Sequence, residues 1–355
     1  MKHIACFLLI IFIYYGCNTN QNDFTSDFRT LIIDKAESFI EHDDQTDLVF
    51  PAFIRTASDH FLVYDGRQNL IFQFNYTGEQ FRYFGREGRG PGEFQSLTNF
   101  WILEDHYLFY DYNGAKMVRY DQNGSFISEY TVDIGELGGR VEHLYDDTVV
   151  LPADGENMAL LKIIDLADAQ SDAQFIGEAL VNEDDGDGLD NREIVERGGI
   201  PTFMKTIYLS ANESGIYAFH STTALLQKFD SDGNLLWEKN LKIPSLENVY
   251  EEFLQRVKEQ ESFLPLYTYA RDMHALDNGV AILFNAPEQK PVSIAWIPDN
   301  GHQLCVIEYT NIEKPANSNA PFRFQVASKE GIVLFANTWE GKVLRSIWPN
   351  NCESS

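Results

Sequence analysis

Three histidines are the side chains in this sequence best suited to binding a metal ion. His143, His220 and His274 lie far apart along the chain, so they would form one zinc site only if the fold brought them to a common centre. Histidines spread in this way also occur as ordinary hydrogen-bonded residues. The sequence contains no G-x-S-x-G, H-E-x-x-H or phosphate-loop pattern. We therefore expect no catalytic residue and no cofactor, and keep a bound metal as the alternative, either zinc at these histidines or calcium.

Two arginines in a glycine-rich segment are candidates for binding an anionic group. The segment 85–94, GREGRGPGEF, contains four glycines and a proline, so it forms a loop rather than a strand or helix interior. Arg86 and Arg89 can hold a carboxylate or a sulfate through their planar guanidinium groups. The alternative is that they pair with nearby carboxylates and fix the loop.

A third set of candidates stands at the ends of strand-like runs. Each member follows the second predicted strand of its repeat, so the fold should bring all of them to one face together with the loop 85–94. Convergent polar groups at the mouth of a channel form a default binding site, although Asp and Asn at such positions also cap the turns that follow them. His220 departs from the Asp/Asn pattern. The set comprises Asp65, Asp111, His220, Asn285 and Asn337.

Regularly spaced tight turns indicate how these residues are positioned. Turn signals at 75–78, 121–124, 230–233 and 298–301 each separate two strand-like runs, and a degenerate copy lies at 165–168. The first turns begin at residues 75, 121 and 165, a period in the forties. Such a period with four short strands in each copy is typical of a β-propeller blade.

The sequence therefore predicts an all-β fold, a six-bladed β-propeller of four-stranded blades. The last blade has only three strands, so a strand near 28–34 is expected to supply the fourth and to close the ring, which removes exposed sheet edges. The domain then spans 28–349, followed by a tail, 350–355. The predicted blades are 48–85, 97–131, 140–178, 203–241, 269–310 and 321–349.

Two insertions lengthen the period. The first, 180–201, is acidic and glycine-rich. Asp185, Asp187 and Asp190 resemble part of a calcium loop but lack its full spacing and terminal Glu, so we expect a solvated loop. The second insertion is expected to form a helix near 246–264 that starts at a Ser245 N-cap and packs its apolar face over one end of the ring.

The N-terminus has the layout of an export signal. An apolar run over 4–15 is too short for a permanent membrane helix and ends in Gly16-Cys17. It resembles a bacterial lipobox, which implies a lipid on Cys17 after cleavage and membrane attachment through it; Tyr14 stands where the lipobox prefers Leu. An uncleaved anchor and an ordinary signal are the alternatives. Residues 18–27 are polar and form a predicted tether.

Cysteine use and charge agree with an exported protein. Cys305 and Cys352 would remain in the mature chain, where an oxidising compartment allows a disulfide; two buried free thiols are the alternative. The formal net charge is −27. This excess of acidic groups argues against nucleic acid as a partner and against binding anionic lipid by charge.

The lipobox-like start, the GREGRGPGEF loop and units such as FLVYDGRQNLIFQFNYTGEQF resemble the six-bladed propeller lipoproteins of Bacteroides-type bacteria. These are distant relatives of NHL-repeat propellers, whose blades carry a comparable glycine-rich segment. The resemblance implies the fold but no common chemistry. We expect an envelope-anchored binding module, on the periplasmic or surface face of the outer membrane, with a glycan, peptide or envelope-protein ligand at the channel mouth. A metal-dependent lyase or hydrolase using the channel histidines is the alternative.

Overall fold

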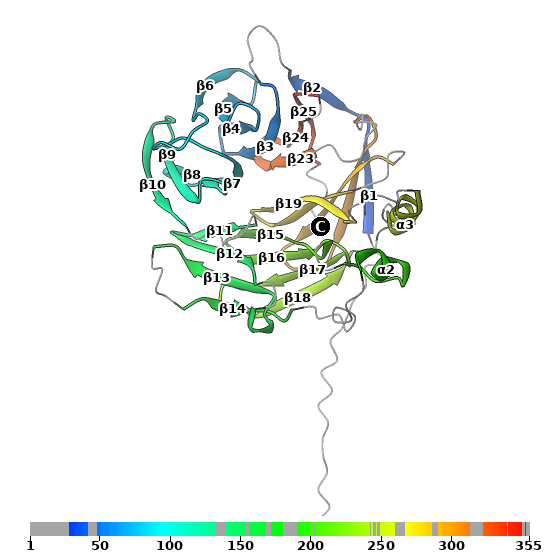
Figure 1. The fold of residues 1–355 in the computed structure, drawn as a ribbon. Coiled ribbons are helices and arrows are strands. Elements are labelled where there is room, and N and C mark those ends of the chain that lie inside the picture. Colours follow the sequence, from blue (N-terminus) through cyan, green and yellow to red (C-terminus); the bar gives the residue numbers. More distant parts are fainter. Residues whose placement is uncertain are drawn as a thin grey trace, which may run out of the picture.

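Short strands follow one another along the chain, and mostly successive strands form six antiparallel sheets arranged in a ring, two of which also take a strand from the N-terminal segment (Figure 1). The predicted signal 1–17 with Cys17, the tether 18–27 and Ser245 lie outside the residues that the structure describes, so these predictions stay untested. The computed structural model describes residues 28–41, 48–132, 140–153, 156–167, 172–179, 190–201, 204–241, 243, 246, 249–259, 267–285, 290–312, 322–338, 340–349 and 352.

The six sheets are the blades of a β-propeller, which confirms the predicted fold class. Blades one and two comprise β3 (Pro51–Thr56), β4 (His60–Asp65), β5 (Leu70–Asn75), β6 (Gln80–Phe84), β7 (Leu97–Ile102), β8 (His106–Asp111), β9 (Lys116–Asp121) and β10 (Phe126–Thr131). Blades three and four comprise β11 (Glu142–Tyr145), β12 (Thr148–Pro152), β13 (Leu161–Asp165), β14 (Gln174–Ile176), β15 (Ile207–Asn212), β16 (Gly215–His220), β17 (Leu225–Phe229) and β18 (Leu235–Asn240). Blades five and six contain β19 (Ala270–Leu276), β20 (Gly279–Phe284), β21 (Val292–Pro298), β22 (Leu304–Tyr309), β23 (Phe322–Ala327), β24 (Ile332–Asn337) and β25 (Lys342–Ile347).

Burial follows the position of a strand in its blade. The second strands β4, β16 and β20 are buried along their whole length, because neighbouring blades cover both of their faces, and their sequences are nearly continuous apolar runs. The fourth strands β6, β10 and β18 are half-buried or exposed except at Phe84. The core therefore lies between the blades, in the contacts of adjacent sheets.

The first strand of each blade lines the centre of the ring. Side-chain hydrogen bonds to backbone carbonyls join these innermost strands from one blade to the next, in addition to the packing of their apolar residues. The chain therefore holds its blades together around the channel as well as through the core. These bonds run from Arg55 Nε to Phe100 O (3.1 Å), Asn99 Nδ2 to Val141 O (2.9 Å), Tyr208 Oη to Ala270 O (3.0 Å), Arg323 Nη1 to Arg271 O (2.7 Å) and Thr56 Oγ1 to Val326 O (3.0 Å).

The predicted tight turns between third and fourth strands also join the blades. Each has a glycine with positive φ, and that glycine packs against the outer strand of the preceding blade. A side chain at the glycine would collide with that strand, so one residue serves both the turn and the interface between blades. The pairs are Gly78 with Phe39, Gly124 with Phe84, Gly233 with Ile176 and Gly301 with Trp237.

Replacing Gly301 with alanine is expected to destabilise the propeller more than the same change at Gly331. Both glycines have similar φ, +67° and +63°, so both substitutions incur backbone strain of about 1 kcal/mol. An added Cβ would lie 2.9 Å from the Trp237 indole at Gly301 but would meet nothing within 4 Å at Gly331. Overpacking should add about 1–3 kcal/mol at Gly301. Urea denaturation of both variants measures the difference, and equal losses would contradict a role for the Trp237 contact.

The ring closes with an N-terminal strand, but not with the one predicted. β2 (Ala36–Ile40) pairs antiparallel with β25 and completes blade six. The run 28–34 was expected there; instead β1 (Phe28–Ile33) pairs parallel with β22 as a fifth strand of blade five. Because Asp34 and Lys35 alone separate β1 from β2, the chain passes directly from one blade to the next (Figure 1).

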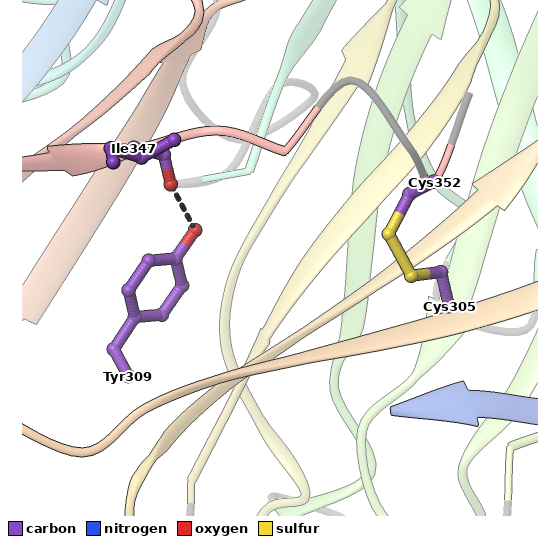
Figure 2. Close-up of a disulfide and its surroundings, with 4 residues drawn as sticks. All are labelled: Cys305, Tyr309, Ile347 and Cys352. Atoms are coloured by element: carbon purple, nitrogen blue, oxygen red, sulfur yellow. Dashed lines mark hydrogen bonds between the residues drawn. A yellow bond between two sulfur atoms is a disulfide. The ribbon is translucent and has the colours of Figure 1, made fainter. Parts of the chain in front are cut away.

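The C-terminal end is fixed to blade five as well (Figure 2). Cys305 on β22 forms a disulfide with Cys352, with Cα atoms 5.8 Å apart, so the pairing left open by the sequence is present. The Tyr309 hydroxyl on the same strand donates a hydrogen bond to Ile347 O at 3.2 Å. Both links join β22 of blade five to the end of β25 and the segment that follows it.

The two insertions carry helices. α2 (Asn191–Glu196) begins at Asp190, whose side chain accepts from Arg192 N and Glu193 N in a capping box. The solvated loop predicted for 180–201 thus includes a helix, and Asp190 is its N-cap. α3 (Val249–Glu259) lies within the predicted helix 246–264 and buries Val249, Phe253 and Val257. The described residues also include the 3-10 turns η1 (Glu156–Met158) and η4 (Ser328–Glu330).

Among the described residues, no helix has both the length and the apolar character needed to cross a membrane.

Candidate functional site

Charged side chains from four blades gather on the innermost strands. We call this group the channel cluster; its members influence one another electrostatically across the ring. The innermost strands carry three arginines and two carboxylates, although the whole chain has a net charge of −27. The channel is therefore less acidic than the rest of the protein. The channel cluster consists of Arg55, Glu142, Asp272, His274 and Arg323.

Asp272 is the centre of an ion-paired network between blades five and six. Its carboxylate is 3.0 Å from His274 Nε2 and 3.3 Å from Arg323 Nη1, and it accepts a hydrogen bond from Phe324 N at 3.2 Å. Burial opposes its ionisation, yet His274, Arg323 and Arg55 outweigh burial and hold the pKa of Asp272 well below its usual range. Burial lowers the pKa of His274, with Asp272 opposing. Asp272 is therefore an anion with fixed partners.

Glu142 on β11 has a different environment. Trp101 Nε1 donates to its Oε1 at 3.1 Å, and Asn99 Nδ2 lies 3.5 Å from Oε2. No described cation lies within ion-pairing distance. Burial raises the pKa of Glu142 to about 7, although Arg55 acts in the opposite direction. Because water still reaches part of the residue, this carboxyl can exchange a proton or accept a cationic group near neutral pH.

Arg55 does not neutralise Glu142 by direct contact. Its Nε donates to Phe100 O, Nη1 to Ile54 O at 2.9 Å and Nη2 to Asn99 Oδ1 at 2.6 Å. All three of its nitrogen atoms are thus bonded to other groups, and the interaction with Glu142 acts through space.

Arg323 on β23 uses only one edge of its guanidinium within the described residues. Nη1 bonds to Arg271 O and pairs with Asp272, and the guanidinium carbon lies 5.4 Å from the centre of the Phe53 ring. Nε and Nη2 have no protein partner in the described part of the chain, and 31% of the side chain is exposed. Arg323 therefore has N–H groups available for an added acceptor.

The mouth residues Asp65 and Asp111 occupy the predicted equivalent positions and are fully buried. Asp65 accepts from Val49 N (2.6 Å) and Phe50 N (2.9 Å) in the segment entering its blade, and from Arg67 N in the next turn. Asp111 repeats the pattern with the segment that enters blade two and with the turn that follows it. Both carboxylates thus cap turns and tie the loop between blades to the same face.

The other mouth residues also have partners within their own blades. Asn337 bonds to Glu340, and His220 Nε2 lies 2.9 Å from Gln227 Oε1. Asn285 accepts from Arg271 Nε at 2.9 Å, which links its side chain to the innermost strand β19. No hydrogen bond joins any two of the five mouth residues in the described structure. Their ligand-binding role stays a prediction.

The loop 85–94 is held by its own carboxylate. Arg86 pairs with Glu93 at 2.5 Å, and Glu93 accepts from Gly90 N at 2.7 Å. A Cβ at Gly88 would lie 1.9 Å from Glu93 Oε2, so glycine is needed there. Arg86 remains 74% exposed despite this pair, and Arg89 is exposed as well. Their role in binding an anion stays a prediction.

The three histidines have separate partners. His143 lies on the innermost strand β11, and its Nε2 is 2.9 Å from Asp146 O, whereas His220 and His274 contact Gln227 and Asp272. Within the described ranges, no group of three or more His, Cys, Asp and Glu side chains is arranged to hold a metal ion.

Of the channel cluster, only His274 was predicted from the sequence as a candidate site residue. Arg55, Glu142, Asp272 and Arg323 each stand inside the first strand of a blade, among mostly apolar neighbours. These residues could have been found by looking for charged residues in the first strand of each blade, because the propeller topology places that strand at the channel.

Comparisons with known proteins agree with the observed architecture. Residues 38–144 match a family described as a 6-bladed beta-propeller, and no curated protein matches. One similar solved structure is a member of the duf4221 family from Bacteroides vulgatus, with a TM-score of 0.55 and 12% identity, covering 89% of this chain and 96% of that one. A second is a Bacteroides fragilis protein that has been proposed to be exported, with a TM-score of 0.48 and 14% identity, covering 79% of this chain and 80% of that one. A third is a catalytically inactive variant of virginiamycin B lyase from Staphylococcus aureus with quinupristin, with a TM-score of 0.47 and 10% identity, covering 88% of this chain and 98% of that one. Identities this low show the fold alone, and the sheet topology and the family match identify the chain as a six-bladed β-propeller.

Proposed function

We propose that this propeller is a binding module of the cell envelope whose ligand, a glycan or a peptide, enters the channel from the mouth. The observation that carries the proposal is the channel cluster, in which Arg323 and Glu142 both offer polar groups that can still bind a ligand. Arg323 has unused N–H donors, and Glu142 has no ion pair among the described residues. Polar groups that converge in a concave site provide orientation and specificity for a ligand.

The proposal includes export and lipid attachment at Cys17. The apolar run 4–15 and the Gly16-Cys17 ending support it, and the Cys305–Cys352 disulfide fits an oxidising compartment. Cells that express the full chain should incorporate labelled palmitate into it, and Cys17→Ser should abolish the label. Label that persists in Cys17→Ser would refute attachment at this residue.

Binding is tested with residues 24–355 on glycan and peptide arrays. A ligand found there should bind at least tenfold more weakly to Arg323→Met, which keeps an unbranched apolar side chain but removes the guanidinium and its donors. Lys329→Met, on the exposed turn between β23 and β24 of the same blade, serves as the control and should bind normally. Equal binding by both variants, with unchanged melting curves, would exclude the channel. Elemental analysis of the same protein that finds one zinc or calcium per chain would redirect the assignment to a metal-dependent lyase or hydrolase.

A further inference from the structure

We infer that the channel binds a short peptide with free termini, whose ammonium group contacts Glu142 and whose carboxylate contacts Arg323. This assignment rests on the proposed function, because it names the ligand class of the same site. It follows from the positions of Glu142 and Arg323 in the ring, from the hydrogen bonds and ion pairs that they already make, and from the side chain of Gln325 beside Arg323.

The two groups lie on opposite sides of the ring. Glu142 belongs to blade three and Arg323 to blade six, and in a ring of six these blades face each other across the channel. The charged residues of the cluster on other blades are already occupied, since Asp272 binds Arg323 and His274, and Arg55 binds backbone and Asn99. A ligand with opposite charges at its two ends would complement Glu142, which has no ion pair in the described residues, and the open N–H groups of Arg323.

The open edge of Arg323 suits a carboxylate. A guanidinium presents parallel N–H groups that match the two oxygens of a carboxylate, and Nε and Nη2 of Arg323 have no partner in the described structure. The Asp272 pair and the Phe53 ring hold the other side of the guanidinium. Arg323 is therefore fixed in place with one binding edge exposed.

Glu142 suits an ammonium group. Its oxygens accept hydrogen bonds from the neutral donors Trp101 and Asn99, and no described Lys or Arg lies within 4 Å. A peptide ammonium would supply the missing charge and would hold Glu142 in its ionised form.

A buried acceptor beside Arg323 favours a peptide over a simple zwitterion. Gln325 lies two residues along β23, so its side chain shares a face of the strand with Arg323. Its Oε1 is buried without a hydrogen-bond partner in the described residues. Such an atom is stabilised by an added donor, and a peptide N–H next to the terminal carboxylate provides one.

Isothermal titration of residues 24–355 with trialanine tests the inference. The free tripeptide should bind, and its N-acetylated and C-amidated forms should each bind at least tenfold more weakly. In Glu142→Gln the effect of acetylation should disappear while that of amidation remains; in Arg323→Met the reverse should hold. Lys329→Met should behave as the unaltered protein.

The outcomes separate the inference from the proposed function. A peptide that binds equally with blocked and free termini would overturn the assignment of Glu142 and Arg323 to its ends. A glycan that requires Arg323, with no binding of trialanine, would overturn the peptide class and leave the binding module standing. If no array ligand and no tripeptide binds the folded protein, both fall.

Discussion

A chain shortened to begin at residue 42 is expected to lose its cooperative thermal transition and to aggregate. The truncation removes β1 and β2, so β25 becomes an unpaired sheet edge. The core loses the side chain of Ile40, which is only 4% exposed, and Gly78 loses its contact with Phe39. Together with the ladder hydrogen bonds, the loss is on the order of 5 kcal/mol, comparable with the whole stability of many domains. Circular dichroism on heating and size-exclusion chromatography measure the result.

A chain that begins at residue 35 is the matched control. It lacks β1 but keeps β2, so blade six retains its fourth strand. This protein should remain folded but melt at a lower temperature than the unshortened protein, since β22 loses only its pairing with β1. Equal stability of the two shortened chains would show that β2 does not close the ring.

Asp272→Asn is expected to lose about 3–5 kcal/mol of folding free energy, the usual effect of breaking a buried ion pair. The substitution removes the charge that compensates Arg323 and binds His274 in a buried position. Asp105→Asn provides the same chemical change at a carboxylate whose side chain is 85% exposed, and it should cause no measurable loss. Denaturant titration at neutral pH compares the two, and similar values would show that the Asp272 network contributes little.

The Asp272 network should also respond to acid. Folding lowers the pKa of Asp272. The stabilisation that its ionised carboxylate provides is therefore complete above the pKa of an ordinary aspartate, about 4, and is lost as the pH falls toward the lower pKa of the folded state. The unaltered protein should therefore lose stability below pH 4 more steeply than Asp272→Asn. Parallel curves for the two proteins would contradict the ionised, paired state of Asp272.

The blades could be predicted from sequence because their turns are local signals. The turns at 121–124 and 298–301 contain the residue types that such turns demand, and a strand lies directly before and after each of them. The partner of the N-terminal strand could not be predicted in the same way, since pairing over such a separation leaves no local pattern. One signal was present: β22, LCVIEY, is almost entirely apolar for a fourth strand, which is expected if a further strand covers it.

The sequence predicted only part of the candidate site. Asp65 and Asp111 stand at the ends of second strands, as the repeat predicts, but their hydrogen bonds to incoming backbone depend on loop geometry that the sequence does not specify. Glu142 and Arg323 come from blades far apart in the chain. They are candidates for binding because Glu142 lacks an ion pair and Arg323 keeps open N–H groups in the described residues, which only the folded structure reveals. Similarly, the helix at Asp190 had a local capping signal, Asp190 with Glu193, inside a segment whose acidic composition favoured a loop.

The way in which the ring closes sets the order of events during folding. Arg345 on β25 bonds to Glu37 on β2 over a separation of 308 residues, so the first strands to be synthesised have no partner until nearly the whole chain is available. Blades one to four can form from contiguous sequence, and so can strands β19 to β22 of blade five, whereas blade six must recruit β2 afterwards, with β1 then added to blade five. Contacts this distant make the closing step slow. During that interval the open ring presents sheet edges at both ends, and this is the period when the protein is most exposed to aggregation.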